Sequence, residues 1–559
     1  MCHCCPLLEL TGEPNFETNL AQFSLGSCFA CRKLKIKYTA CVEPEQGKLI
    51  VEASLCLKTK QSGEFEVELP ANTTYIKFVI KIFAKCEDQK PKCIKIIKCF
   101  PPQLEIELNQ SNLTLRTTMQ NCNRFAIDAS GYDHANAREQ MGPCRASRAM
   151  AIVHIAMFEA YLAIVGGYQS YLPVPPVAPA GASVEAAIAQ ATHDSLLSLF
   201  PAQATRINDQ LVFDLSGIPD GTSKTDGLTV GAAAAAAILT LRATDGADSA
   251  PVKPETSYAD YIAANPAGNT PGLWTQDPIS NLGVALGYKW DLVTPFVMTS
   301  SSQFRCPALP LLTSGTYTAA FDEVKAVGGD GTTTPTTRSA ELTNVGIYWA
   351  YDGVPNLCAP PRMYNQIAMK LAIQQGLDNA QMFRMLALLN IAMADSGISA
   401  WEAKYYYKFW RPVTGVRETH RDGTPAPDGN AATVADLTYT PLGAPATNNS
   451  GVDFTPPFPA YPSGHATFGG ALFQTLRNVL GSDDIAFTFV SDELNGVTQD
   501  SQGNVRPLLP RSFTSLSQAE EENAQSRMYL GIHWSFDKLG VPMGNQIADL
   551  VYSTVYLPL

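Results

Sequence analysis

The sequence predicts a mainly α-helical protein. We expect a helical-bundle body, holding two four-helix bundles, after a small N-terminal all-β domain rich in cysteine. A chain of 559 residues is too long to fold around one ordinary hydrophobic core, so two or more domains are expected. Residues 1–115 alternate apolar and polar positions, whereas apolar residues recur at helical spacing from about residue 140. The two domains are therefore expected at residues 1–115 and 120–559, joined through residues 109–120.

The N-terminal domain is predicted from its strand patterns. Residues 33–38, 65–69 and 104–108 alternate apolar and polar side chains, as half-buried strands do. Turn-forming residues separate these segments. The pattern indicates a small antiparallel β-sandwich.

The cysteines are concentrated in the same domain. Ten of the 14 lie before residue 100, a density that indicates either a disulfide network or a metal site. A structural zinc ion is one alternative, and disulfides or reduced thiols are the others. The candidate zinc ligands are Cys2, His3, Cys4, Cys5, Cys28 and Cys31.

The body is expected to consist of helices joined by loops. The expected helices are residues 150–162, 184–200, 227–242, 337–351, 361–375, 379–395, 398–410, 464–480, 516–531 and 541–556. Loops rich in Pro and Gly are expected at 170–182, 250–275 and 326–336, with long ones at 419–460 and 483–515. Long loops beside packed helices often carry function.

Charge and hydropathy exclude several classes of protein. The net charge of −12 argues against general nucleic-acid binding. The N-terminus lacks a basic segment followed by an apolar one, so no signal peptide is expected. No run of 18 uncharged apolar residues is present, so we expect a soluble protein without a transmembrane helix. The compartment stays open, as does a homo-oligomeric state.

The first candidate motif is a pair of cations in the expected helix 398–410. Lys404 and Arg411 are seven residues apart, close to two helical turns, so both can project from one face. Pro412 is expected to end the helix. The alternative is a solvated helix face, but five aromatic residues between the two cations argue against it.

The second motif is a helix start at Ser463-Gly464-His465. Ser463 stands where an N-cap is expected, and a helix N-terminus offers free N–H groups to an anion. Gly464 permits close approach of the backbone, and His465 falls in the first turn. The alternative is a capping serine next to a packed histidine.

The third motif joins Arg527, Gly531, His533 and Asp537. We expect the helix to end near Gly531, so that His533 turns back toward Arg527. Asp537 can then accept a hydrogen bond from one ring nitrogen of His533 and leave the other free to attack or ligate. A structural ion pair is the alternative for each residue alone. Together the three motifs supply the cations, hydroxyl, N–H and imidazoles that a tetrahedral oxyanion needs.

These motifs resemble those of the vanadium-dependent haloperoxidases, within the superfamily of acid phosphatases and type 2 phosphatidic acid phosphatases. The resemblance covers roughly residues 120–559. It implies a vanadate cofactor, with His533 as the ligand to the metal and His465 as the acid–base group. The residues implied to bind vanadate are Lys404, Arg411, Ser463, Gly464, Arg527 and His533. Those implied to be catalytic are His465, Lys404 and His533.

Three further residues extend the resemblance. Trp401, three residues before Lys404, and Phe458, seven before His465, correspond to positions that line the family's halide pocket. Phe at the second position resembles chloroperoxidases, although chloride and bromide both stay open. Asp352 is expected to pair with one of the arginines.

The implied reaction is oxidation of halide by hydrogen peroxide to hypohalous acid, which halogenates a small organic acceptor. The alternative is a soluble acid phosphatase, in which His533 attacks phosphorus and His465 protonates the leaving group. Trp401 and Phe458 favour the first reading, because an aromatic, water-poor pocket suits halide better than a bulky phosphomonoester.

Overall fold

The structure is a computed structural model of the chain. Side chains are described for residues 115–266, 270–420 and 423–559, and before residue 115 only the backbone of the strands and of the first helix start is described. The chain divides into two compact units, Met1–Thr117 and Thr118–Leu559. The division falls in the predicted joining segment.

The N-terminal unit contains antiparallel and parallel strand pairs. A two-stranded sheet pairs β1 with β2, and a second sheet has the order β3-β4-β5-β6. The strands are β1 (Leu8–Leu10), β2 (Phe23–Leu25), β3 (Leu34–Glu43), β4 (Lys48–Leu57), β5 (Tyr75–Ala84) and β6 (Lys92–Cys99). Residues 34–38 of the expected strand 33–38 fall within β3.

Several predictions for this unit lie outside the described residues. These are the strands 65–69 and 104–108 and the zinc candidates Cys2, His3, Cys4, Cys5, Cys28 and Cys31. Where side chains are described, no group of three or more His, Cys, Asp or Glu residues suits a metal ion. The β-sandwich and the zinc site stay predictions.

The second unit is mainly helical, as predicted. Its helices are α1 (Gln110–Ala135), α2 (Gly142–Val165), α3 (Val184–Leu199), α4 (Ala204–Leu215), α5 (Thr222–Arg242), α6 (Tyr258–Ala264), α7 (Gly315–Val327), α8 (Ala340–Tyr348), α9 (Pro361–Gln374), α10 (Asn379–Tyr407), α11 (Pro412–Gly415), α12 (Gly464–Leu480), α13 (Leu516–Tyr529) and α14 (Gly540–Thr554). Two short strands, β7 (Phe487–Phe489) and β8 (Arg511–Phe513), pair antiparallel within the expected loop 483–515.

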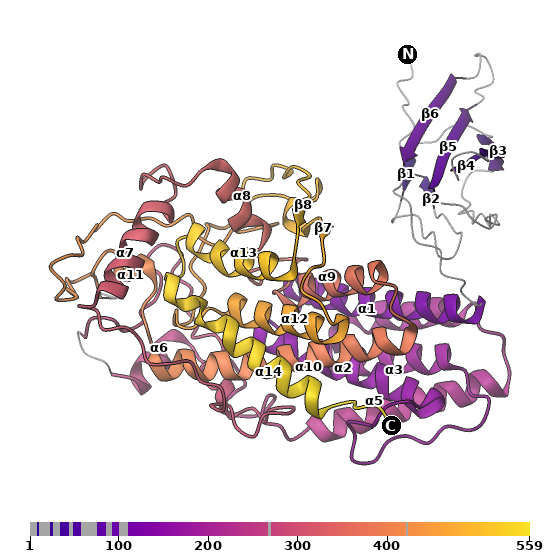
Figure 1. The fold of residues 1–559 in the computed structure, drawn as a ribbon, viewed down its shortest axis with the longest axis horizontal. Coiled ribbons are helices and arrows are strands. Elements are labelled where there is room, and N and C mark those ends of the chain that lie inside the picture. Colours follow the sequence, from indigo (N-terminus) through magenta and orange to yellow (C-terminus); the bar gives the residue numbers. More distant parts are fainter. Residues whose placement is uncertain are drawn as a thin grey trace. The chain divides into compact units, whose positions relative to one another are not determined.

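Helix α10 is the centre of this unit. It packs against α2 on one side and against α12 and α14 on another, while α2 also contacts α3 and α5 (Figure 1). Every residue from Met385 to Tyr405 is buried, as expected of a helix covered all round. A capping box formed by Asp378 and Gln381 starts the helix.

The predicted helices 379–395 and 398–410 are one continuous helix, so that prediction was wrong. Gly397 lies at the expected break, but there it allows α10 to pack closely against α2. A Cβ on Gly397 would lie 3.2 Å from Ser147 Oγ. The helix ends at Tyr407, because Lys408 adopts a left-handed conformation with φ 52°. It therefore does not reach Pro412, which instead opens α11.

Among the described residues, five helices were not predicted: α1, α4, α7, α11 and α6, which lies inside the expected loop 250–275. Residues 109–120, expected as a join, contain the start of α1, and α7 falls where no helix was predicted. Ser314 caps α7 by accepting a hydrogen bond from Tyr317 N–H at 3.3 Å, a local signal that the sequence did carry.

Helix α2 is, among the described residues, the one helix long and apolar enough to cross a membrane by length and composition. Within the structure, 83% of its most apolar stretch is buried. The helix contains no unbroken run of 18 uncharged apolar residues, because Arg145, Arg148 and Glu159 interrupt it.

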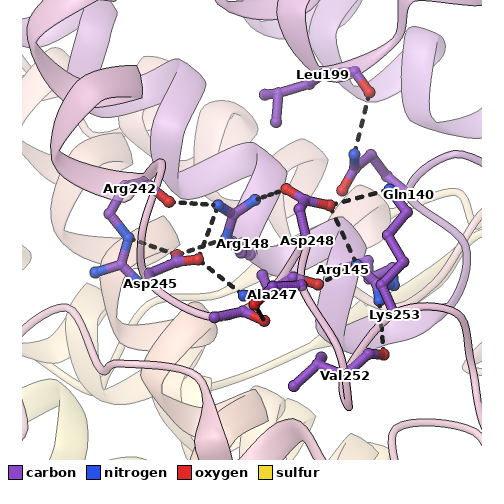
Figure 2. Close-up of polar contacts among 12 residues, drawn as sticks. Gln140, Arg145, Arg148, Leu199, Arg242, Asp245, Ala247, Asp248, Val252 and Lys253 are labelled. Carbon is purple, nitrogen blue, oxygen red and sulfur yellow. Dashed lines mark hydrogen bonds and ion pairs between the residues drawn. The ribbon is translucent and has the colours of Figure 1, made fainter.

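Those two arginines anchor α2 to the loop that follows α5 (Figure 2). Arg148 Nε lies 2.7 Å from Asp245 Oδ2, and Arg242 Nη2 lies 2.8 Å from the same carboxylate oxygen. Arg145 Nε lies 2.9 Å from Glu255 Oε1. Each of these buried arginines pairs with a carboxylate, and the pairs hold the loop after α5 against α2.

Candidate active site

Residues from distant segments meet at one cavity. The cavity has a volume of about 390 Å³, and its lining includes His465, Arg527 and His533. His465 lies in the first turn of α12 and Arg527 in the last turn of α13. His533 follows α13, where Gly531 takes a φ of 71° and turns the chain as predicted.

The N-terminus of α12 has the predicted cap. Ser463 Oγ accepts a hydrogen bond from Ala466 N–H at 3.3 Å. The backbone N–H of Ser463 donates to the Asp537 carbonyl at 2.9 Å, which ties this turn to the segment that carries His533. Gly464 lies against Trp401, since a Cβ on it would stand 3.2 Å from two ring carbons.

His533 is held by Asp537, as predicted. Its Nδ1 lies 2.6 Å from Asp537 Oδ2, and the Trp534 N–H donates to the same oxygen at 3.0 Å. Nδ1 therefore carries the proton and Nε2 is the acceptor. Burial raises the pKa of Asp537 to about 7, and burial next to Arg411 lowers the pKa of His533 well below its usual value.

Arg411 is fully packed behind His533. Its Nε donates to the Phe458 carbonyl at 2.9 Å, and its Nη1 donates to the Ile532 carbonyl and to His533 Nε2, each at 2.8 Å. Nη2 is buried without a hydrogen-bond partner among the described residues. Burial lowers the pKa of Arg411 to about 9.

Arg527 has one paired and two unpaired nitrogens. Its Nη2 donates to both carboxylate oxygens of Asp352, at 2.6 and 2.8 Å, so the predicted Asp352 contact is present. Its Nε and Nη1 are buried without a partner in the described part of the chain. Buried donors left unpaired are costly, and an anion is their natural acceptor.

Lys404 departs from the predicted geometry. It lies in the last turn of α10, whereas Arg411 follows the helix as the N-cap of α11, so the two do not share a helix face. The strand-like segment between them pairs with residues 272–274, through hydrogen bonds at 2.7 and 2.9 Å. The prediction was wrong because this tertiary pairing ends the helix.

The ammonium of Lys404 is directed at backbone carbonyls. Its Nζ donates to Pro459 at 3.0 Å, to Ala460 at 2.8 Å and to Pro462 at 2.5 Å. All three donors are thus used by the loop that leads to Ser463. Burial and the charge of Arg411 lower the pKa of Lys404, whereas the three carbonyl acceptors favour its charged form.

His465 is neutral and has an assigned tautomer. Its Nε2 lies 2.5 Å from the Ala350 carbonyl, which can only accept, so Nε2 carries the proton and Nδ1 does not. Burial and the charge of Arg527 lower the pKa of His465 well below its usual value. In the neutral ring Nδ1 is therefore the unprotonated nitrogen, which acts as a hydrogen-bond acceptor.

Trp401 and Phe458 lie together beside these cations. Their ring centroids are 4.8 Å apart, and Lys404 Nζ stands 5.1 Å from the Phe458 centroid. Arg411 lies over the same ring at 4.9 Å. Both aromatic residues line the cavity, which therefore has an apolar wall next to a positive field.

The sequence prediction missed most of the cavity wall. The loop 351–358 contributes to it and contains three residues other than glycine with positive φ: Tyr351 at 46°, Asn356 at 66° and Cys358 at 60°. Buried Glu493 accepts the Tyr351 N–H at 3.2 Å and holds the start of this loop. Apart from the predicted site residues, the sequence pointed to the wall only through the expected long loop 419–460, which also supplies wall residues.

Parts of the chain are similar to known proteins. Residues 384–557 match the family model described as the VCPO second helical-bundle domain. Over 276 residues the chain is 38% identical to vanadium chloroperoxidase from Curvularia inaequalis. The match covers 43% of this chain and 44% of that protein, so the chain spans less than half the length of the curated relative it matches.

Solved structures share the fold. A bacterial vanadium-dependent iodoperoxidase has a TM-score of 0.60 at 23% identity, covering 82% of this chain and 98% of that chain. The apo form of a bacterial vanadium-dependent chloroperoxidase has a TM-score of 0.54 at 16% identity, covering 74% and 94%. Its holo form has 0.51 at 17%, covering 74% and 92%. The chain thus shares its fold with vanadium-dependent haloperoxidases of known structure, and part of its sequence is similar to vanadium chloroperoxidase and to the VCPO second helical-bundle domain.

Proposed function

We propose that the chain is a vanadate-dependent haloperoxidase, which oxidises halide with hydrogen peroxide to hypohalous acid. One observation carries the proposal: three buried guanidinium nitrogens of Arg411 and Arg527 lack partners among the described residues, beside His533. Such preorganised donors suit an oxyanion. The relatives named above act with vanadium on chloride or iodide, which supports the same chemistry here.

The residues present fit vanadate. Arg411 Nη2 and Arg527 Nε and Nη1 would donate to its oxygens, together with the Ser463 hydroxyl and the Gly464 N–H. His533 would ligate the metal through Nε2, for which Arg411 Nη1 must give up its hydrogen bond. Bound vanadate supplies a Lewis-acidic centre that activates hydrogen peroxide toward halide.

The remaining groups handle protons and charge. His465, neutral with an unprotonated Nδ1, would accept a proton from hydrogen peroxide. Asp537 keeps the His533 proton on Nδ1, and Asp352 orients Arg527 through its two contacts. Lys404 fixes the loop before Ser463, and contacting vanadate directly would require it to exchange one of its three carbonyl partners.

Trp401 and Phe458 form the proposed halide pocket. Their rings exclude water from the cation side of the cavity, which strengthens the attraction between an anion and the buried charges. Phe458 leads us to propose competence with chloride as well as bromide. The whole region 120–559 is the proposed catalytic domain, with its helices forming two bundles that share α10.

The experiment is reconstitution of the metal-free protein with orthovanadate. We expect oxidation of iodide to triiodide, and bromination of monochlorodimedone, only when both vanadate and hydrogen peroxide are present. Chloride is tested in parallel. Hydrolysis of a phosphomonoester by the metal-free protein faster than any halide oxidation by the reconstituted one would overturn the proposal in favour of a phosphatase.

A further inference from the structure

The cavity above the proposed vanadate site is larger than the inorganic substrates need. Halide and hydrogen peroxide contain one and two non-hydrogen atoms, whereas the cavity has a volume of about 390 Å³. Pockets of about 300–1,000 Å³ hold small organic ligands. Most of this space therefore lies beyond the site of halide oxidation.

The wall of this space is apolar. It is lined by Leu282, Val284, Leu286, Val452, Phe454 and Pro457. Leu282 and Val452 are 37% and 59% exposed, whereas Phe458, at the inner end, is 8% exposed. An apolar path thus leads from solvent to the halide pocket, and burying a hydrophobic molecule along it is favourable.

The wall is built as a fixed surface. Its two main loops are joined where Leu286 N–H donates to the Pro457 carbonyl at 3.0 Å and Thr455 N–H donates to Asp277 Oδ2 at 2.9 Å. Pro456 and Pro457 restrict the second loop further. Little ordering is then required when a ligand binds.

The charges at the cavity select against cationic ligands. Asp352 is neutralised by its two contacts with Arg527. Arg138 lines the outer part and is exposed, and its guanidinium has no hydrogen-bond or ion-pair partner among the described residues. A neutral molecule, or one with an acidic substituent such as a phenol, meets no opposing charge.

We propose that this cavity binds the organic acceptor, an apolar and electron-rich aromatic molecule, so that halogenation takes place inside the protein. The inference rests on the proposed function. Hypohalous acid would transfer its halogen to a ring carbon: the carbon–halogen bond forms, the oxygen–halogen bond breaks, and the departing hydroxide takes the ring proton as water. Confinement would decide which ring carbon reacts.

A binding experiment tests the site without the reaction. 2-Naphthol is titrated into the metal-free full-length protein and followed by its fluorescence. The double variant Leu282→Glu and Val452→Glu, which places charges on the apolar wall, should weaken binding about tenfold or more. The matched control is Val497→Glu with Leu508→Glu, whose side chains are 74% and 57% exposed away from the cavity lining. Equal affinity in both double variants would overturn the inference.

A second experiment separates this inference from the proposed function. With vanadate, peroxide and iodide but no acceptor, triiodide formation should be the same in the wild type and both double variants. Bromination of 2-naphthol should saturate, with KM about tenfold higher in the wall variant only. Two results together would overturn this inference but not the proposed function: a bromination rate that does not depend on 2-naphthol concentration, and the same brominated products as free hypobromous acid gives. Absence of triiodide in the wild type would overturn the proposed function.

Discussion

At the residue scale, the site depends on donors and acceptors that the protein itself leaves unmatched. Arg411 and Arg527 present buried nitrogens without partners among the described residues. Asp352 contacts one nitrogen of Arg527, and Asp537 contacts one ring nitrogen of His533. Each carboxylate thus orients a cation or an imidazole without neutralising the whole site. This is how a positive cradle can be stable yet ready to receive an anion.

Asp537→Asn should weaken vanadate binding. The amide can still accept from His533 Nδ1, but it loses the charge that fixes the ring and strengthens Nε2 as a ligand. We expect orthovanadate affinity to fall about tenfold to a hundredfold. Calorimetric titration measures the change, and Asp484→Asn, at an exposed position, is the matched control. Unchanged affinity in Asp537→Asn would contradict the role of His533 as the ligand.

At the element scale, loops hold the aromatic and strained parts of the wall in place. Gly287 has a φ of 72°, and a Cβ on it would lie 2.4 Å from Trp401 Cδ1. Leu286, the preceding residue, accepts hydrogen bonds from Trp401 Nε1 at 3.0 Å and Tyr405 OH at 2.9 Å. The network of Figure 2 extends to this loop, because Glu255 pairs with Arg145 and accepts the Gly287 N–H at 2.9 Å.

Gly287→Ala should displace Trp401 and destabilise the fold. Overpacking of this kind costs about 1–3 kcal/mol. Gly429→Ala is the matched control, since Gly429 has a similar φ of 75° with nothing within 4 Å of its Cβ position. The difference in free energy of unfolding between the two variants, measured by urea titration, isolates the Trp401 contact. No difference would show that Trp401 yields freely.

Glu493, which accepts the Tyr351 N–H, should make the stability of the fold depend on pH. Burial raises the pKa of Glu493 to about 7 from 4.5. The folded protein then binds more protons than the unfolded chain between these values, so this residue's contribution to stability falls as pH rises through the window. Glu493→Gln should flatten that fall in urea unfolding free energies. Glu521→Gln, at a side chain 63% exposed, should leave the slope as it is.

At the scale of the whole molecule, α10 joins two groups of helices, one made of α2, α3 and α5 and the other of α12 and α14. It runs for 29 residues, with α2 on one side and α12 and α14 on another, and it ends in the turn that carries Lys404. Lys404 then joins it to the loop before Ser463. The geometry of the site is therefore a property of the whole helical unit.

Leu389→Ala tests this coupling. The side chain is fully buried in α10, and its truncation should cost about 2–5 kcal/mol. Because α10 belongs to both groups, hydrogen exchange should rise in α3 and in α14 together. Leu241→Ala, at a residue 40% exposed on α5, provides the control with little expected change. Faster exchange confined to one group would show that the groups unfold independently.

Local chemistry made much of the site predictable. The Ser463 cap, the turn at Gly531 and the contact between His533 and Asp537 each depend on residues within a few positions, and the structure has all three. The helix 464–480 has the predicted bounds for the same reason. Predictions failed where distant segments decided the outcome, as in the single helix α10 and the segment after Tyr407.

The sequence by itself determined which groups are available and how each short motif turns, because caps, glycine turns and neighbouring hydrogen bonds act over a few residues. Only the tertiary structure decided that Lys404 points at three carbonyls, that Arg527 keeps two donors unpaired within the described chain, and that separate loops enclose an apolar cavity. Those features arise from contacts between segments more than 50 residues apart, for which local pattern carries no signal.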